Sequence, residues 1–385
     1  MSCVFISMIF ILSISSGHAA DNAASPEVEK ELARELVLPE LIARSHNVLA
    51  LGYTDVGQWQ QTAHHAAEAA TLYAGLSNRA MEADCLGLMG NAHTHLGQTQ
   101  VGIALARQAL AITREIQNPW GQVTATLHLS EGLVDAGDYV EALSLIEQAV
   151  QLARDHQLVP LLPYALAISA KVKRALLDLE AAQAAGLAAL TADEAMPTQP
   201  FAEMIHAELC AGYALAGDWT AAHNHARQAL AARPADSLYL GLSRWYEIEA
   251  LLRGGDHALA REDAHHFERL VTNPDYGNNN PRFLIPVRRC RAVMAQWDGD
   301  QKQAIAHLEG AYALATDIDL PGERWPVLVK LAELYQAAGD NVKAKAVRAE
   351  AAGIIYTLAG KIEGTELRAT FLAAVNVRQV VEPAT

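Results

Sequence analysis

The sequence has few of the features that carry nucleic-acid binding, nucleotide hydrolysis or a disulfide framework. Its 385 residues include four cysteines and no Cys-x-x-Cys pair, which favours buried apolar cysteines over disulfides. Lys and Arg number 29 against 44 Asp and Glu, a net charge of −15 that argues against nucleic acid or an anionic membrane surface as the main partner. No Gly-x-x-x-x-Gly-Lys-Ser/Thr loop occurs, which excludes that phosphate-binding motif from the chain.

Catalytic and metal-binding signatures are also missing. Gly241-Leu-Ser243-Arg-Trp245 begins like a nucleophile elbow, but tryptophan stands at the position of the second glycine. Eight of the fifteen histidines form pairs at spacings of one or two residues, which place the two members on different helix faces; the pairs are His64–His65, His93–His95, His223–His225 and His265–His266. His64 has Glu68 four residues later, but two ligands do not make a metal site. The sequence therefore predicts no catalytic residue, no metal site, no cofactor and no enzymatic activity.

What the chain does have is a glycine that recurs about every forty residues. The markers are Gly57, Gly97, Gly137, Gly217, Gly255, Gly299 and Gly339, and Leu177 stands where the missing one is due. Five of them directly precede an aspartate. Glycine accepts the left-handed backbone that follows a helix, and aspartate caps the next helix. Eight units of two helices each, sixteen paired helices in all, are the predicted architecture.

Three columns of mostly small residues keep the same phase as the markers. Seven residues before each marker lie Ala50, Gly90, Ser130, Ala170, Cys210, Ile248, Ala292 and Ala332. Five residues after it lie Thr62, Gly102, Ala142, Ala182, Ala222, Ala260, Ala304 and Ala344. Twelve residues after it lie Ala69, Ala109, Ala149, Ala189, Ala229, Phe267, Ala311 and Ala351. Small side chains at fixed phase allow helices to approach closely, so these positions are expected at helix contacts.

These offsets resemble the tetratricopeptide (TPR) pattern, and the resemblance covers residues 38–381. Tyr53, Tyr213 and Tyr335, four before their markers, fit it, and Pro39, Pro119, Pro160, Pro200 and Pro321 are expected just before first helices. The period of forty is similar to that of the MalT-like TPR region of bacterial signal-transduction ATPases and transcriptional regulators, as is the tail from Leu367 to Val381. The resemblance implies an all-α, right-handed superhelical solenoid and, as a partner, a separate ATPase or regulator. The ATPase and DNA-binding modules of those proteins are not recognisable here.

The N-terminus offers two interpretations. Residues 4–14 are apolar apart from two serines, and small residues near 17–20 fit a cleavage site, so residues 1–20 form a candidate signal peptide. Against it, no Lys or Arg precedes Lys30, and a misassigned start is the alternative. The apolar run is too short for a stable membrane span. Export to the periplasm follows in the first case and a cytoplasmic protein in the second.

The predicted domains are the candidate signal peptide at 1–20, an N-terminal helix or partial repeat at 21–37, the repeat array at 38–364, and a C-terminal capping helix with tail at 365–385.

The concave surface of the array is the candidate binding site. First-helix positions predicted to line its groove are Arg44, Asn47, Asn91, Thr94, Glu131, Lys171, Arg174, Trp245, Glu249, Arg289 and Gln296. Amides can bind a peptide backbone, basic side chains can bind carboxylates, and tryptophan can anchor an apolar group. The leading interpretation is a non-enzymatic scaffold that binds a peptide or partner protein in this groove. The alternatives are a ligand- or regulator-sensing arm, or a detached remnant, of a signal-transduction ATPase.

Overall fold

The computed structural model describes residues 26–233, 241–274, 276–362 and 364–382, and these ranges are helical with short turns and no strand. The candidate signal peptide at 1–20 lies outside them. The helices are α2 (Pro26–Asp55), α3 (Trp59–Gly75), α4 (Arg79–His95), α5 (Thr99–Glu115), α6 (Pro119–Ala136), α7 (Tyr139–Asp155), α8 (Leu162–Ala175), α9 (Leu179–Glu194), α10 (Ala202–Ala216), α11 (Trp219–Ala232), the 3₁₀ turn η1 (Gly241–Ser243), α12 (Arg244–Arg253), α13 (His257–Thr272), α14 (Pro281–Trp297), α15 (Gln301–Asp317), α16 (Pro321–Ala337), α17 (Asn341–Lys361), α18 (Thr365–Ala373) and α19 (Val375–Val381). Within the described ranges, α2 to α17 form eight consecutive antiparallel pairs, here called units one to eight, and the predicted right-handed helical-repeat solenoid is confirmed.

Residues with a left-handed backbone conformation form the turns of the repeat. Every marker glycine has a positive φ, from 72° at Gly57 to 91° at Gly255, and Leu177 takes the missing place with a φ of 59°. The turns between units use the same conformation, as at Gln117 and Gln157 with φ of 52° and 53°. Glycine adopts this backbone without steric cost. A left-handed residue therefore recurs every 20 residues through the first half of the array, once per helix.

The aspartates after the markers mostly act as helix caps. A carboxylate oxygen accepts the N–H of the residue three positions on, and the capping residues are Asp178, Asp218, Asp300 and Asp340. Such a cap satisfies one of the exposed N–H groups of the first turn. Asp138 and Asp256 form other contacts, because Asp138 binds Lys361 and Asp256 binds His223.

The three small-residue columns lie at helix contacts. All of their alanines are buried, and so are the exceptions Thr62, Ile248 and Phe267. Neighbouring helices of a pair and of adjacent units pack through these positions, so the core runs along the whole array and is not confined to one centre. A solenoid buries its apolar surface unit by unit in this way.

Replacing Ala304 with leucine should lower the free energy of unfolding by about 1–3 kcal/mol, because the larger side chain overpacks a tight contact. Ala304 is fully buried on α15. Ala306 lies on the same helix and is exposed, so Ala306→Leu is the matched control and should change stability by about 0.5 kcal/mol or less. Urea titration followed by circular dichroism measures both, and equal stabilities for the two variants would contradict this packing.

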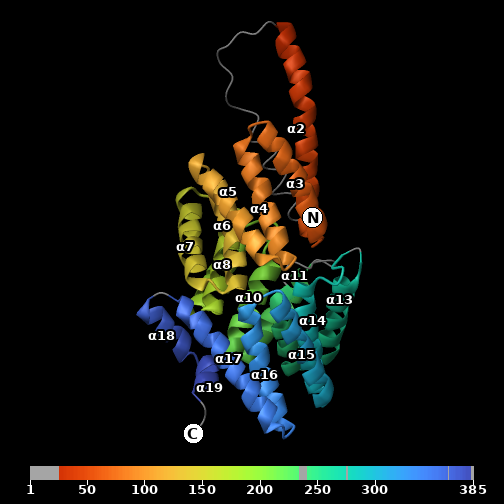
Figure 1. Ribbon diagram of the computed structural model, residues 1–385, viewed down its shortest axis with the longest axis vertical. Coiled ribbons are helices and arrows are strands. Elements are labelled where there is room, and N and C mark those ends of the chain that lie inside the picture. Colours follow the sequence, from red (N-terminus) through yellow and green to blue (C-terminus); the bar gives the residue numbers. More distant parts are fainter. Residues whose placement is uncertain (1–25, 234–240, 275, 363, 383–385) are drawn as a thin grey trace.

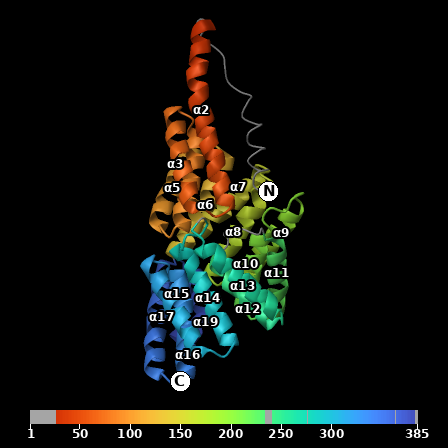
Figure 2. The same cartoon turned by 90° about the vertical axis from the view of Figure 1, so that its right-hand side faces the viewer.

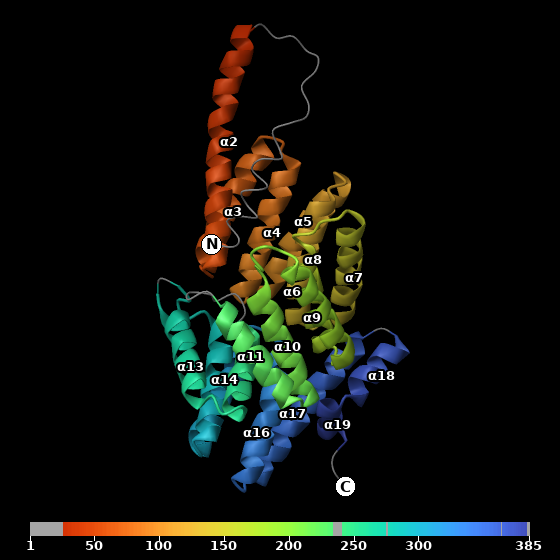
Figure 3. The same cartoon turned by 180° about the vertical axis from the view of Figure 1, so that it is seen from behind.

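The superhelix completes a full turn and contacts itself. In Figures 1 to 3, α13 to α17 lie below α3 to α6 in every view. Unit two meets unit seven and unit three meets unit eight, so units five places apart in the chain are in contact. We call this contact the seam. One hydrophobic cluster extends across it, joining residues of units two to five to residues of units seven and eight.

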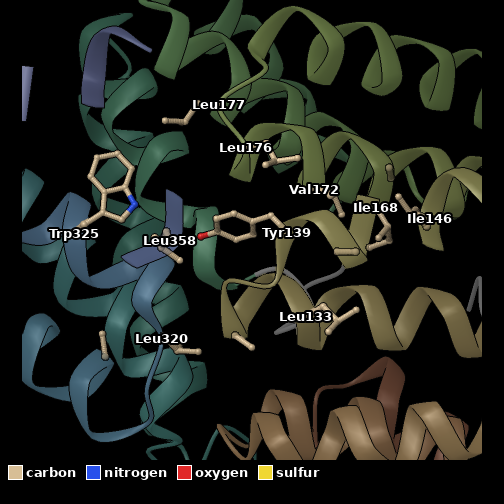
Figure 4. Packing of buried hydrophobic residues seen from close by; sticks show 14 of the residues in the cluster. Leu133, Tyr139, Ile146, Ile168, Val172, Leu176, Leu177, Leu320, Trp325 and Leu358 are labelled. Atoms are coloured by element: carbon tan, nitrogen blue, oxygen red, sulfur yellow. The ribbon is translucent and has the colours of Figure 1, made fainter. Parts of the chain in front are cut away.

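Polar and apolar contacts both hold the seam. Asn280 donates its side-chain N–H to the carbonyl of His95 at 2.8 Å, and Lys361 binds the carbonyl of Ala136 at 2.9 Å. Gly137 has φ of 76°, and a Cβ there would approach Cδ2 of Leu358 to 2.4 Å, so a larger residue would strain the turn and displace the Leu358 side chain at the seam. Figure 4 shows Tyr139, with Leu358, Leu320 and Trp325, where the two halves meet.

The ends of the array differ in detail from the sequence-based picture. Residues 26–37 continue without a break into the first helix of unit one, and Pro39 lies inside α2, not before a helix. A proline within a helix removes one backbone hydrogen bond, and α2 continues on both sides of it. At the C-terminus two short helices, α18 and α19, stand where one was expected, because Ala374 has extended backbone between them. In the described ranges no helix is long and apolar enough to cross a membrane.

Candidate functional site

First helices from seven units surround one central cavity of about 110 Å³. Helices α4, α6, α8, α10, α12, α14 and α16 all contribute lining residues, and because α6 contacts α16, the cavity adjoins the seam. The charged side chains that line it, taken from the described residues, are Lys171, Arg174, Arg282, Arg289, Asp135, Glu208 and Glu323. The lining also includes Tyr139, Tyr246, Trp325, His95, Ser243 and several small or aliphatic residues. Such a mixture of apolar walls and convergent polar groups is typical of a ligand-binding site.

Each basic side chain of the cavity is paired with a carboxylate on a different helix. The pairs are Lys171 with Glu131 at 2.9 Å, Arg174 with Glu208 at 2.8 Å, Arg282 with Asp135 at 2.9 Å, and Arg289 with Glu323 at 2.6 Å. Three of them join first helices that are neighbours in the array, and the Arg282 pair crosses the seam. Pairing of this kind offsets part of the cost of burying charge.

Sequence reasoning found half of this set. Lys171, Arg174 and Arg289 were predicted groove residues and they line the cavity, with Glu131 bound to Lys171. Glu131 and Lys171 have opposite charges and occupy the same repeat position in consecutive units. The sequence alone could therefore have predicted this ion pair. Asp135, Glu208, Arg282 and Glu323 were missed, because they occupy different repeat positions and Arg282 meets Asp135 only through the seam.

The Arg289 guanidinium is held against an aromatic ring. It lies 3.8 Å from the centroid of Trp245, and Trp245 in turn packs on Tyr246 with ring centroids 3.6 Å apart. Arg289 is 6% exposed, whereas Trp245 is half-buried. Stacking and the bond to Glu323 fix the guanidinium plane at the edge of the cavity. Trp245 therefore supports a cavity residue from behind and does not itself line the cavity.

Other predicted groove residues lie away from the cavity. Asn47 on α2 hydrogen-bonds Asp84 and Cys85 of the neighbouring unit, and Arg44 on the same helix is exposed. Asn91 and Thr94 are buried in α4. The remaining two are Glu249, which pairs with Arg253 on its own helix at 2.7 Å, and Gln296, which is half-buried near the end of α14.

Buried histidines adjoin the charged cluster. Burial lowers the pKa of His95 well below its ordinary value, and the nearby Arg282 lowers it further. An Arg282 N–H donates to Nδ1 of His95 at 2.9 Å, so this nitrogen carries no proton. Burial likewise lowers the pKa of His128 to about 4, against a smaller opposing effect of Glu131. Burial also opposes ionisation of Glu131, but Lys171 outweighs it and holds the pKa of Glu131 below its usual value.

Two further histidine pairs occupy equivalent positions in units one and five. In each, the two Nδ1 atoms are 2.9 Å apart, and the second ring stacks on the tyrosine four before the marker; the pairs are His46–His65 with Tyr53 and His206–His225 with Tyr213. Burial, then the neighbouring histidine, lowers the pKa of His225 to about 4 and also lowers that of His65. No group of three or more His, Cys, Asp or Glu among the described residues is arranged to hold a metal ion.

Stability should fall as pH is lowered from 6.5 to 5. In this window the unfolded chain binds protons on histidines whose folded pKa is lowered, so protons favour the unfolded state. For a histidine whose pKa falls from 6.5 to about 4, such as His128, the cost at pH 5 reaches about 2 kcal/mol.

Urea unfolding at pH 8, 6.5 and 5 checks this expectation. His128→Gln should flatten the fall, whereas the exposed His257→Gln should leave it unchanged. Stability that stays level or rises between pH 6.5 and 5 would contradict it.

Comparison with known proteins shows the fold. No family model matches the sequence, and no curated protein matches it. Many solved structures are similar, and three of them are described here. A Rap protein complexed with competence and sporulation factor has 14% identity and a TM-score of 0.50, over 86% of this chain and 81% of its own. The apo quorum sensor NprR from B. thuringiensis has 12% identity and a TM-score of 0.52, over 86% and 92%. A human IFIT1 dimer with m7Gppp-AAAA has 13% identity and a TM-score of 0.50, over 84% and 76%. These values show a TPR-like helical-repeat solenoid, while the resemblance to the MalT-like region stays a prediction.

Proposed function

We propose that this chain is a non-enzymatic protein-interaction scaffold that holds a segment of a partner protein or peptide on its concave side, with the central cavity as the main contact. The observation that carries the proposal is the cavity itself. First-helix side chains from seven units, of both charges and with aromatic neighbours, converge there on a helical-repeat frame. Rigid elements position such groups better than loops do.

The similar structures bear on the choice of partner. The Rap protein was solved with competence and sporulation factor, and NprR is a quorum sensor, which supports a signalling role for a solenoid of this fold. IFIT1 was solved with a capped RNA, but the net charge of −15 here is unfavourable for a polyanion. A partner protein therefore fits this chain better than RNA. A separate ATPase or regulator is the partner class that the MalT-like resemblance implies.

Affinity capture with tagged variants tests the proposal. The wild-type protein should retain a partner that Glu208→Gln loses, because Glu208 lines the cavity. Arg107→Gln is the matched control, since Arg107 lies on second helix α5, is about half exposed and pairs with Glu141 on α7. Capture that survives Glu208→Gln but is lost with Arg107→Gln would place binding on the outer surface and overturn the proposal.

A further inference from the structure

One face of α2 is apolar and exposed. It lies opposite the buried Ala43 and Ala50, at the outer edge of the array (Figures 1 and 3). Seven residues at helical spacing make up this face, here called the α2 stripe: Leu38, Leu41, Ile42, Ser45, Val48, Leu49 and Gly52. Its five large apolar side chains are 42% to 63% exposed. A contiguous apolar surface of this kind marks an interaction site.

In the next unit the same positions are buried. Forty residues on, α4 carries Met81, Cys85 and Leu88 at stripe positions, and each is at most 9% exposed. They share hydrophobic clusters with residues of α2 and α3, the two helices of the preceding unit. The α2 stripe is therefore the surface by which a first helix packs on the unit before it, and no described residue takes that place for α2.

The glycines at one stripe position show the same difference. Gly52, Gly132 and Gly212 lie 80 residues apart, at the same place in their first helices. A Cβ on Gly132 would lie 2.9 Å from Cγ1 of Ile103, and one on Gly212 would lie 3.8 Å from Cγ of Gln183, each on the second helix of the preceding unit. At Gly52 no atom of the described residues lies within 4 Å. Gly52 thus leaves space for a side chain from another molecule.

The stripe is symmetric in sequence about Ser45, its central residue. Aliphatic residues stand three and four positions away on both sides, and at seven positions stand Leu38 on one side and Gly52 on the other. Two such helices packed antiparallel about a two-fold axis at Ser45 would place aliphatic side chains against one another. The exposed Leu38 of each copy would fill the space beside Gly52 of the other, and serine at the axis allows close approach.

We propose that the α2 stripe is a dimer interface, in which α2 of a second copy of this chain occupies the place of a preceding unit. The symmetry about Ser45 favours a second copy over an unrelated helix, because a two-fold contact requires the same surface to fit itself. No residue of α2 lines the central cavity, so the interface is separate from the site of the proposed function. Both can be occupied at once.

Sedimentation equilibrium of the full chain tests the interface. The wild type should show a monomer–dimer equilibrium with a dissociation constant on the order of 10 µM, because one helix pair is a small interface. Ile42→Glu places a charge in the contact on both copies and should raise that constant by about a hundredfold or more. Leu187→Glu on α9 is the matched control, since Leu187 is 45% and Ile42 is 42% exposed, and it should dimerise like the wild type. If Ile42→Glu does not fold by circular dichroism, Leu49→Lys replaces it with the same expected result.

A cysteine at the proposed axis tests the antiparallel arrangement. Helices packed about 8–10 Å apart bring facing backbones within disulfide range, so Ser45→Cys should form a disulfide between two copies under mild oxidation. A non-reducing gel detects the cross-linked dimer. Ser144→Cys, exposed on α7, is the matched control and should give no more of it than the wild type, in which Cys85, Cys210 and Cys290 are buried.

Each contrary result overturns the inference. A wild-type chain that is monomeric at about 100 µM would reject the dimer and assign the stripe to another protein or to residues 1–25 of the same chain. Equal dimerisation of the wild type and Ile42→Glu would place the interface elsewhere. Growth beyond the dimer with rising concentration, or a dimer in which Ser45→Cys does not cross-link, would reject the two-fold contact at Ser45.

Discussion

Replacing Arg282 with methionine should lower the free energy of unfolding by about 3–5 kcal/mol, because it leaves a buried carboxylate without its counter-charge. Arg282 is 2% exposed and donates to Asp135 and to His95, both across the seam. Methionine retains much of the length of the side chain, so the lost charge and hydrogen bonds dominate the effect. Chemical unfolding at pH 7 measures it.

Two further variants test whether the loss of stability comes from the Arg282–Asp135 ion pair. Arg291→Met on the same helix removes a half-exposed arginine and should change stability by about 0.5 kcal/mol or less. Adding Asp135→Asn to Arg282→Met should recover part of the loss, because it removes the unpaired charge. Equal stabilities of Arg282→Met and Arg291→Met would mean that the ion pair does not hold the seam.

Replacing Arg233 with methionine should cost a similar 3–5 kcal/mol or more, because three carboxylates then face one another with less positive charge between them. The Arg233 side chain is 4% exposed and binds Glu203 at 2.6 Å, Asp263 at 3.1 Å and Glu247. Burial raises the pKa of Glu247, and the positive charge of Arg233 opposes this rise.

Two further variants test whether Arg233 stabilises the fold through its carboxylate partners. Arg227→Met on α11 removes an exposed arginine that lies 3.7 Å from Asp256, and it should be nearly neutral. Glu247→Gln introduced with Arg233→Met should recover part of the stability, since it removes one of the repelling charges. A loss below about 0.5 kcal/mol for Arg233→Met alone would show that solvent screens this cluster.

The seam connects the fold to the proposed function. Arg282 and Asp135 both line the cavity and hold the two halves together, so the cavity depends on closure of the superhelix. In an open array the same first helices would be present, but α6 would lie far from α14 and α16. The predicted groove residues Lys171, Arg174 and Arg289 therefore meet in one place only because unit three reaches unit eight.

The sequence by itself determined the helical pairs, their turns and their packing columns. The reason is local: a left-handed residue follows most helices, and small residues recur at a fixed distance from the marker position, so neighbouring units repeat one set of contacts. Tertiary structure alone decided which charged residues surround the cavity. Arg282 and Asp135 are 147 positions apart, and Lys361 and Asp138 are 223 apart. Small rotations between units add up along the array, and only their sum brings these residues together, so no periodic pattern in the sequence marks the seam.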